Sequence, residues 1–260
     1  MGGRRRRMAI QSVVSRTSDR LLTVDELHTR LQEIGRDFYH HRHPFHLLMH
    51  EGKLNRGQLQ AWALNRYYYQ RAIPIKDAII LSRSDDRNFR IAWRKRIIDH
   101  DGDALSDGGI ERWIALAEAT GLNRDRVENH EEVLPGVRYA VDAYLSLVRD
   151  RSFLEAVASS LTELFSRDLI ALRIDALREH YSWMNNGLAY FEARLEQAPE
   201  DARFAFDWVA KHALTRADQE LAMAALREKC AILWAQLDAI YYSYVNPGWP
   251  PPGAFIPEKE

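Results

Sequence analysis

The sequence has little cysteine and almost no net charge. Cys230 is its only cysteine, and 36 Lys and Arg balance 37 Asp and Glu to leave a formal net charge of −1. A single thiol excludes an intramolecular disulfide and any zinc or iron–sulfur site built from several cysteines. A near-neutral chain has no global field that attracts nucleic acid or an anionic membrane. We therefore expect neither partner, and the single cysteine fits a reducing, cytoplasmic location.

Long apolar runs are also lacking, since no segment approaches the roughly 20 residues of a membrane-spanning helix. Four arginines near the start resemble the basic region of a signal peptide, but polar residues from Gln11 to Arg16 interrupt the segment that follows. The sequence contains no GxGxxG, GxxxxGK[ST], GxSxG, HExxH or ExxH motif. These absences argue against a dinucleotide site, a P-loop, a serine-hydrolase elbow, a zincin and a ferritin-type di-iron site.

Apolar residues recur at spacings of three and four, and no alternating strand pattern stands out. Capping residues mark the expected helix starts. They include Thr23 with Glu26, Asn55, Asp85 or Asp86, Ser152, Pro199 with Asp201, and Thr215, which opens a last helix of about thirty residues. The pattern predicts an all-α fold with three parts. These are a flexible basic tail at 1–20, one helical domain at 21–246 and a Pro-rich tail at 247–260.

Cations interrupt the apolar stripes of five expected helices. They are Arg66, Arg96, Arg173, Arg194 and Lys229. An unpaired buried charge costs several kcal/mol, so these side chains need buried acids or a bound anion. Glu163 is the only acid that we find in a comparable position. The stripes thus predict a cavity for a polycarboxylate or phosphate. An equally open alternative is that two or three of the arginines lie on the surface.

Residues able to transfer protons accompany these cations. His100 follows Phe89, Trp93 and Arg96 along one face, although Arg96 could instead reach outward and His100 could simply interact with the helix C-terminus. We expect His40, His100 and Glu163 to serve in proton transfer. Tyr39, Tyr69, Tyr144 and Tyr190 would supply walls and hydroxyl groups.

The histidine-rich stretch from His40 to His50 could suggest a metal site. His46 and His50 lie four residues apart, but two histidines are too few for a metal site without a suitably placed carboxylate, and no HExxH motif is present. We therefore expect these histidines to line or cap a polar junction, and we predict no metal site.

Several segments resemble the pyrroloquinoline-quinone synthase (PqqC) family of the heme-oxygenase-like, TenA-like superfamily. They are Tyr39-His40 with HPFH at 43–46, WALNRYYYQ at 62–70, RIIDHDGD at 96–103, GGIERW at 108–113, SSLTELF at 159–165, Tyr190 to Arg194, and Lys229. The resemblance implies a compact seven-helix bundle, usually a homodimer. It also implies the last step of pyrroloquinoline quinone (PQQ) biosynthesis, in which the bicyclic polycarboxylate precursor AHQQ undergoes ring closure and oxidation. O₂ is then the co-substrate, H₂O₂ is released, and no metal or organic redox cofactor is needed.

The resemblance also assigns roles to residues. It implies catalytic roles for His100, Tyr190, Arg194, Glu163 and His40. It places Tyr39, Arg66, Tyr69, Gln70, Arg96, Tyr144, Thr162, Arg173 and Lys229 around the substrate. In one position this sequence departs from the family pattern, because Ile170 stands where a histidine is expected seven residues after the glutamate.

Two alternatives remain beside this interpretation. A TenA-like hydrolase of the same fold would need a cysteine nucleophile, and Cys230 is the only candidate. Cys230 has the setting of a small core residue. A carrier that binds PQQ or its precursor without turnover is the second alternative, and Ile170 suggests it.

Overall fold

The computed structural model describes residues 20–258, and in this range the chain is built from α-helices and short 3₁₀ segments. Except for Arg20, the predicted tail at 1–20 lies outside the described residues. The helices are α1 (Val24–Phe38), α2 (Pro44–His50), α3 (Arg56–Gln70), α4 (Ala72–Ser82), α5 (Arg87–Asp101), α6 (Gly109–Ala119), α7 (Arg124–Glu128), α8 (Pro135–Asp150), α9 (Phe153–Ala158), α10 (Ser166–His180), α11 (Ala189–His212) and α12 (Arg216–Tyr244). The 3₁₀ segments are η1 (His40–Arg42), η2 (Ser159–Phe165) and η3 (Ser182–Gly187).

The all-α prediction is confirmed, but the described range holds twelve α-helices rather than seven. Short helices such as α2 and α9 account for part of the difference, because caps at His43 and Ser152 begin a new helix after only a few residues. None of the helices in residues 20–258 is both long and apolar enough to cross a bilayer.

Side-chain caps fix most helix starts where the sequence predicts them. Thr23, Asn55, Ser152 and Thr215 each accept a hydrogen bond from the amide three residues later, and the side chain of that later residue bonds back to the cap. Such reciprocal boxes satisfy two amide groups that would otherwise lack a partner at the start of a helix. Asp86 caps α5 in a simpler way, through the amide of Asn88.

The prediction that Pro199 and Asp201 begin a helix is wrong, because α11 continues through both residues. A proline inside a helix removes one hydrogen bond and costs about 3 kcal/mol or more. Packing on both sides offsets that cost here, since Ala198, Asp201 and Ala202 are buried. Arg96 also donates a hydrogen bond of 2.7 Å to the Asp201 carbonyl and so fastens this stretch to α5.

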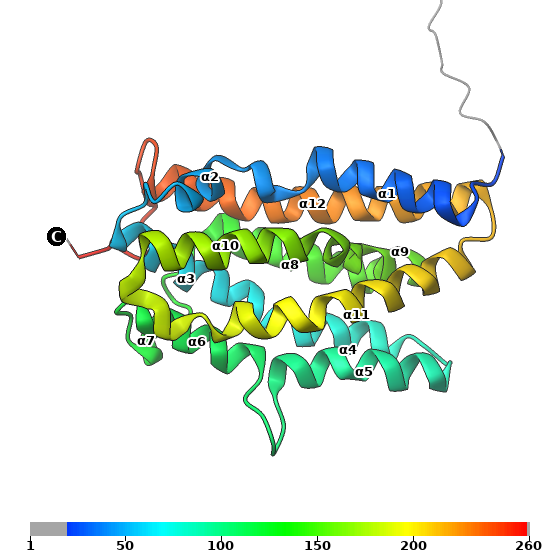
Figure 1. The fold of residues 1–260 in the computed structure, drawn as a ribbon, viewed down its shortest axis with the longest axis horizontal. Helices are drawn as coiled ribbons and strands as arrows, with labels where there is room; N and C mark the ends of the chain where they lie inside the picture. The colour runs from blue at the N-terminus through cyan, green and yellow to red at the C-terminus, as the bar shows by residue number, and fades with distance from the viewer. Residues whose placement is uncertain (1–19, 259–260) are drawn as a thin grey trace, which may run out of the picture.

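The helices lie roughly parallel in layers (Figure 1). Helices α1 and α12 lie side by side at one edge, α8, α9 and α10 occupy the middle, and α4 and α5 pair at the opposite edge. Helix α11 runs between the middle layer and α5, and it packs on η2 and α10. Large apolar side chains such as Trp62, Trp93 and Trp113 fill the interior.

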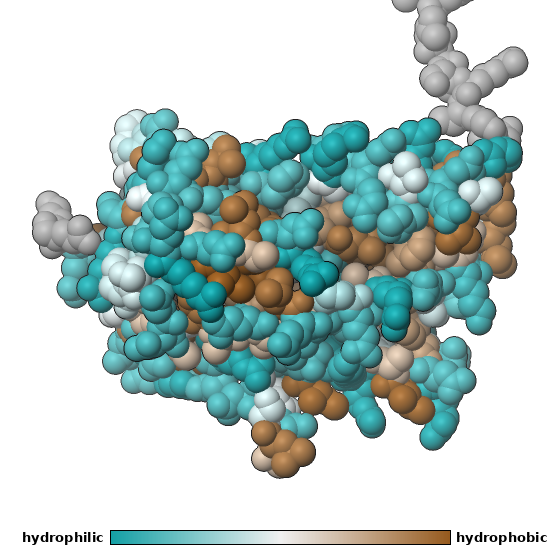
Figure 2. Space-filling model, in the orientation of Figure 1, coloured by the Kyte–Doolittle hydropathy of each residue, from teal (hydrophilic) through white to brown (hydrophobic). Residues whose placement is uncertain are grey.

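Two irregular segments complete the fold. The loop between α5 and α6 projects from the body and carries an apolar tip, where Leu105 is 95% exposed (Figures 1 and 2). Residues 247–258 form no helix. Phe255 is nevertheless buried, and its amide donates a 3.0 Å hydrogen bond to the Glu132 carbonyl. The Pro-rich segment therefore packs on the helical domain at this point.

Gly108 permits the close approach of the two ends of the projecting loop. A Cβ atom at Gly108 would lie 2.2 Å from the His100 carbonyl oxygen and 2.3 Å from the Gly102 nitrogen. We expect Gly108→Ala to lower the free energy of unfolding by about 1–3 kcal/mol, because backbone must move to make room. Urea denaturation would measure the loss. Ala104→Ser, in the exposed part of the same loop, is the control, and equal stability of both variants would contradict the prediction.

Candidate active site

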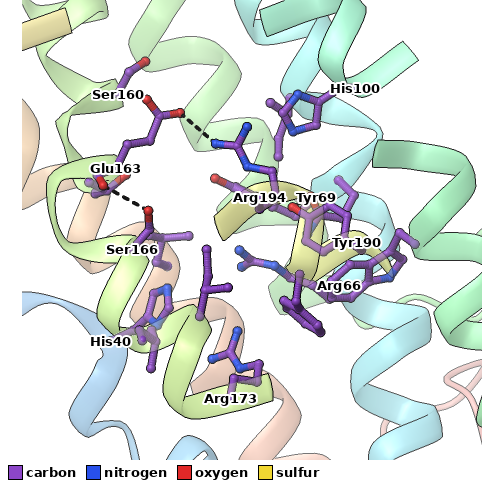
Figure 3. A pocket seen from close by; sticks show the side chains of 18 of the residues that line it. His40, Arg66, Tyr69, His100, Ser160, Glu163, Ser166, Arg173, Tyr190 and Arg194 are labelled. Atoms are coloured by element: carbon purple, nitrogen blue, oxygen red, sulfur yellow. Dashed lines mark hydrogen bonds and ion pairs between the residues drawn. The ribbon is translucent and has the colours of Figure 1, made fainter. Parts of the chain in front are cut away.

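A cavity near the middle of the bundle gathers most of the predicted site residues (Figure 3). Its predicted members are Tyr39, His40, Arg66, Tyr69, Gln70, His100, Tyr144, Thr162, Glu163, Arg173, Tyr190 and Arg194. Ile73, Lys76, Trp113, Ser160, Ser166, Leu169, Ile170, Phe191 and Leu233 complete the lining. Residues from all parts of the described chain therefore converge on one space.

Arg96 and Lys229 are not in the lining but lie directly behind it. Arg96 is 2% exposed and holds Glu163, while Lys229 donates a 2.8 Å hydrogen bond to the Tyr69 hydroxyl. The alternative in which Arg96 reaches outward to solvent is therefore wrong. Arg173 and Arg194 are buried as well, and Arg66 is half-buried, so the surface alternative for these arginines is also wrong.

Acids neutralise two of the five predicted cations, Arg96 and Arg194. The guanidinium of Arg96 donates a 2.8 Å hydrogen bond to Glu163, and Arg194 lies 3.3 Å from Asp201 and 3.7 Å from Glu163. Figure 3 shows Arg194 and Glu163 facing each other. Burial alone would raise the pKa of Glu163, but Arg96 and Arg194 hold it below its usual value. Burial raises the pKa of Asp201 to about 6, although both arginines oppose this shift.

The expectation that Glu163 is the only acid in a comparable position is wrong, because Asp77 and Asp201 are buried and both are less exposed than Glu163. Asp77 binds Lys76, a further buried cation, at 2.6 Å. Lys76 also donates a 3.3 Å hydrogen bond to Ser160. The Lys76–Asp77 pair could be recognised in the sequence, because these two charged residues interrupt an otherwise apolar segment of α4. For Asp201 the sequence carries no comparable signal, because the nearby Pro199 predicts a helix start, where an acid is usually exposed.

The other three predicted cations have no carboxylate partner in the described part of the chain. Within residues 20–258, no carboxylate lies within 4.0 Å of the charged nitrogens of Arg66, Arg173 or Lys229. Aromatic rings and neutral dipoles surround them instead. Arg66 lies 4.0 Å from the Tyr69 ring, and Lys229 lies 3.1 Å from the Tyr144 ring. Burial, helped by Arg66, lowers the pKa of Lys229 well below its ordinary value. This side of the cavity can accept an anion.

His100 is held as a neutral imidazole. Its Nδ1 lies 3.0 Å from the Arg96 carbonyl oxygen, which can only accept a hydrogen bond, so Nδ1 carries the proton and Nε2 keeps its lone pair. Burial and then the charge of Arg194 lower the pKa of His100 to about 3. The imidazole is therefore uncharged at neutral pH, and its Nε2 is placed to accept a proton.

Tyrosines and an amide supply polar groups between these charges. The Tyr190 hydroxyl donates a 2.9 Å hydrogen bond to the Gln70 side chain, and the rings of Tyr69 and Tyr144 stack at 6.2 Å. Burial raises the pKa of Tyr39 to about 12 and raises the pKa of Tyr69 further. These two hydroxyls therefore stay protonated at neutral pH and can donate hydrogen bonds.

The histidine-rich stretch forms a polar junction. His43 caps α2 through the Phe45 amide and binds Asp238, while His46 contacts His40, His50 and the guanidinium of Arg173. Among the described residues, no three His, Cys, Asp or Glu side chains cluster as a metal site would require.

Cys230 is buried in α12, and it does not line the cavity. Burial raises the pKa of its thiol to about 12. A buried, protonated thiol is a poor nucleophile, because the thiolate is the reactive form. The cavity therefore contains no candidate for the nucleophile of a cysteine-dependent hydrolase.

The fold belongs to a known architectural class. A domain from Shewanella denitrificans OS217, described as having a heme oxygenase-like fold, superposes with a TM-score of 0.69 at 14% identity and covers 89% of this chain and 96% of its own. A TenA homologue from Pseudomonas syringae pv. tomato superposes with a TM-score of 0.67 at 10% identity, with 86% and 98% covered. The described domain is thus a heme-oxygenase-like helical bundle.

Sequence comparison narrows the class. Residues 28–239 match the model of the TENA/THI-4/PQQC family, and the chain belongs to that family. A protein from Xanthomonas campestris pv. campestris (strain 8004), named pyrroloquinoline-quinone synthase, is 54% identical over 92% of this chain and 96% of its own length. A protein of the same name from Acidiphilium cryptum (strain JF-5) is 55% identical over 90% of this chain and 96% of its own. The predicted resemblance is therefore confirmed.

The Lys76–Asp77 pair allows a test of buried charge. We expect Asp77→Asn to lower the free energy of unfolding by about 3–5 kcal/mol, because Lys76 would remain buried without its counter-ion. Combining it with Lys76→Met removes the orphaned charge and should restore much of the loss. Urea denaturation of the single and double variants measures both effects. A double variant that is less stable than Asp77→Asn would contradict this account.

Neutral buried histidines predict loss of stability in acid. The folded pKa of His100, about 3, lies below its ordinary value of 6.5, so the unfolded chain binds a proton first and stability falls as the pH drops below 6.5. His40 and His46 act in the same direction. For His100 the loss between pH 7 and pH 5 is about 2 kcal/mol. The raised pKa of Asp201 opposes it, because that group takes up a proton in the folded state between pH 6 and pH 4.

The measurement is the free energy of unfolding from urea titrations at pH 7 and pH 5. His100→Gln should make the dependence on pH shallower by about 2 kcal/mol over this range. The control is His212→Gln, at an exposed position in the last turn of α11. An unchanged slope for His100→Gln would show that His100 is not the neutral buried group described.

Proposed function

We propose that this protein is a pyrroloquinoline-quinone synthase, which closes the last ring of AHQQ and oxidises it to PQQ with O₂. The observation that carries the proposal is 54–55% identity to proteins of that name over nearly the whole length of each chain. The site supports the proposal independently. Arg66 and Arg173 in the lining, and Lys229 behind it, lack a carboxylate partner among the described residues and would suit the carboxylates of such a substrate. Guanidinium groups bind carboxylates with two parallel hydrogen bonds, which also fixes orientation.

The cations would also favour the chemistry. Removing a proton from a ring carbon leaves negative charge on the ring and its carbonyl oxygens. The Arg66 guanidinium is a fixed positive group that stabilises such charge without reorganising during the reaction, and a bound anion would favour the protonated form of Lys229. Arg96 and Arg194 would contribute less to stabilising charge on the ring, because Glu163 and Asp201 already neutralise them.

We assign the role of general base to His100, with Tyr190 and His40 assisting. Its Nε2 is free to accept a proton because Nδ1 is bonded to the Arg96 carbonyl. The protein's own groups give His100 a folded pKa of about 3, which makes it a weak base. A polycarboxylate bound beside it would add negative charge and raise its pKa toward the range useful for catalysis.

The electron-rich ring would then reduce O₂. Each O₂ that becomes H₂O₂ takes two electrons and two protons from the substrate. Arg194 and Lys229 would stabilise the superoxide or peroxide anion as it forms. In this proposal no metal or organic cofactor takes part, the enzyme works as a homodimer, and it acts in the cytoplasm.

The test is to mix purified protein with AHQQ under anaerobic conditions, follow absorbance, and then admit O₂. We expect a spectral change before O₂, from deprotonation of the bound precursor, and PQQ with H₂O₂ after it. His100→Asn should bind AHQQ but lower the rate of the first change by about 10²-fold or more, as expected for loss of a general base. Equal rates in both proteins would remove His100 from this role.

Two further outcomes would overturn the proposal. Binding without oxidation after O₂ would favour the carrier alternative, and Ile170→His, which places an imidazole at a lining position, would then test whether the missing family histidine is the cause. Loss of all turnover on chelation, with recovery on adding iron alone, would contradict a reaction without a metal.

A further inference from the structure

Arg173 has an unusual partner for a buried guanidinium. Its Nη2 lies 3.0 Å from Nε2 and 3.3 Å from Nδ1 of His46, and no carboxylate among the described residues binds it. Arg173 lines the cavity, whereas His46 lies behind it on α2 and is 2% exposed. The ring of His46 therefore contacts the guanidinium of Arg173 from behind, and Arg173 faces the cavity.

A hydrogen bond to His40 fixes the tautomer of His46. Nη2 of Arg173 is nearly equidistant from the two ring nitrogens, so it lies over the face of the ring and not along either lone pair. Nδ1 of His46 lies 3.1 Å from the His40 carbonyl oxygen, which can only accept. The proton of His46 is therefore on Nδ1. Burial and the charge of Arg173 lower the pKa of His46 well below its ordinary value, in agreement with a neutral ring.

The same arrangement determines the tautomer of His40. The Nδ1 atoms of His40 and His46 lie 3.3 Å apart. Two N–H groups cannot face each other at that distance, so Nδ1 of His40 bears a lone pair and its proton is on Nε2. The cavity-lining ring of His40 is thus an Nε2–H donor. Stacking on Tyr39, with ring centroids 4.3 Å apart, holds it in place.

We propose that His46 is a positioning residue, which holds Arg173 against the face of its uncharged ring and sets the tautomer of His40, so that both present donors to a substrate carboxylate. This inference rests on the proposed function for the identity of the substrate. The contrast within the site supports it. Asp201 and Glu163 position Arg194 and neutralise it, but His46 positions Arg173 without cancelling its charge. The charge remains available to the ligand.

The test compares three substitutions at this position. His46→Gln keeps a neutral polar side chain beside Arg173 and a donor for the His40 carbonyl, and we expect its affinity for PQQ to stay within about threefold of wild type. His46→Leu removes the polar ring beside Arg173 and the hydrogen bond to the His40 carbonyl, and we expect a loss of about tenfold or more, as for a desolvated contact between a cation and a ring. His46→Glu would neutralise Arg173, and we expect a loss at least as large as that of His46→Leu.

His43→Gln is the matched control. His43 is equally buried and lies three residues away, but it binds Asp238 and does not contact Arg173. The readouts are the Kd for PQQ and the kcat and KM for AHQQ. We expect the losses in KM and Kd to exceed any loss in kcat. Equal losses for His43→Gln and His46→Leu would indicate a merely structural role, and an unaffected His46→Glu would overturn the proposal.

A readout independent of turnover separates this inference from the proposed function. In protein labelled with ¹⁵N-histidine, NMR at pH 7 should show His46 protonated on Nδ1 and His40 protonated on Nε2. The opposite tautomer or an imidazolium at His46 would overturn the inference even if the enzyme is active. If the tautomers are as stated and the wild-type protein neither binds PQQ nor oxidises AHQQ, the proposed function fails instead.

Discussion

The structure depends on how buried positive charge is compensated. Six cations from different helices lie in or beside one cavity, namely Arg66, Lys76, Arg96, Arg173, Arg194 and Lys229. Taking a charge out of water costs several kcal/mol unless a partner offsets it. Lys76, Arg96 and Arg194 have carboxylates, whereas Arg66, Arg173 and Lys229 have only rings and neutral dipoles among the described residues. The protein's own described side chains therefore leave the positive charge of the site incompletely balanced, and an anionic ligand would balance it.

The arrangement of helices makes this incompleteness possible. Acids from α4, η2 and α11 meet cations from α4, α5 and α11, and they stabilise that half of the bundle without a ligand. The unpaired cations come from α3, α10 and α12, where large aromatic rings take the place of acids. The cations thus form two groups. Lys76, Arg96 and Arg194 are paired with acids within the bundle, whereas Arg66, Arg173 and Lys229 are suited to binding a ligand.

The sequence predicted much of this, for a physical reason. Periodicity identifies which face of a helix is buried, so cations within apolar stripes could be recognised, and Arg96 and Arg173 are indeed buried. Periodicity does not give the depth of a side chain. It could not show that Arg96 and Lys229 lie behind the cavity wall, or that His46 contacts Arg173 from a distant helix. The burial of Asp201 does not follow from the local sequence. Pro199 favours a helix boundary, but packing on both sides of α11 lets the helix continue through it.

The neutral histidines follow from the same electrostatic imbalance. Burial first and nearby arginines second lower the pKa of His40, His46 and His100, so these rings stay uncharged. An anion bound among Arg66, Arg173 and Lys229 would reverse part of that effect and make the imidazoles more basic. By thermodynamic linkage, a ring that becomes more basic on binding also makes binding tighter when it takes up a proton. The features that favour a polycarboxylate would therefore also activate the groups needed to deprotonate it.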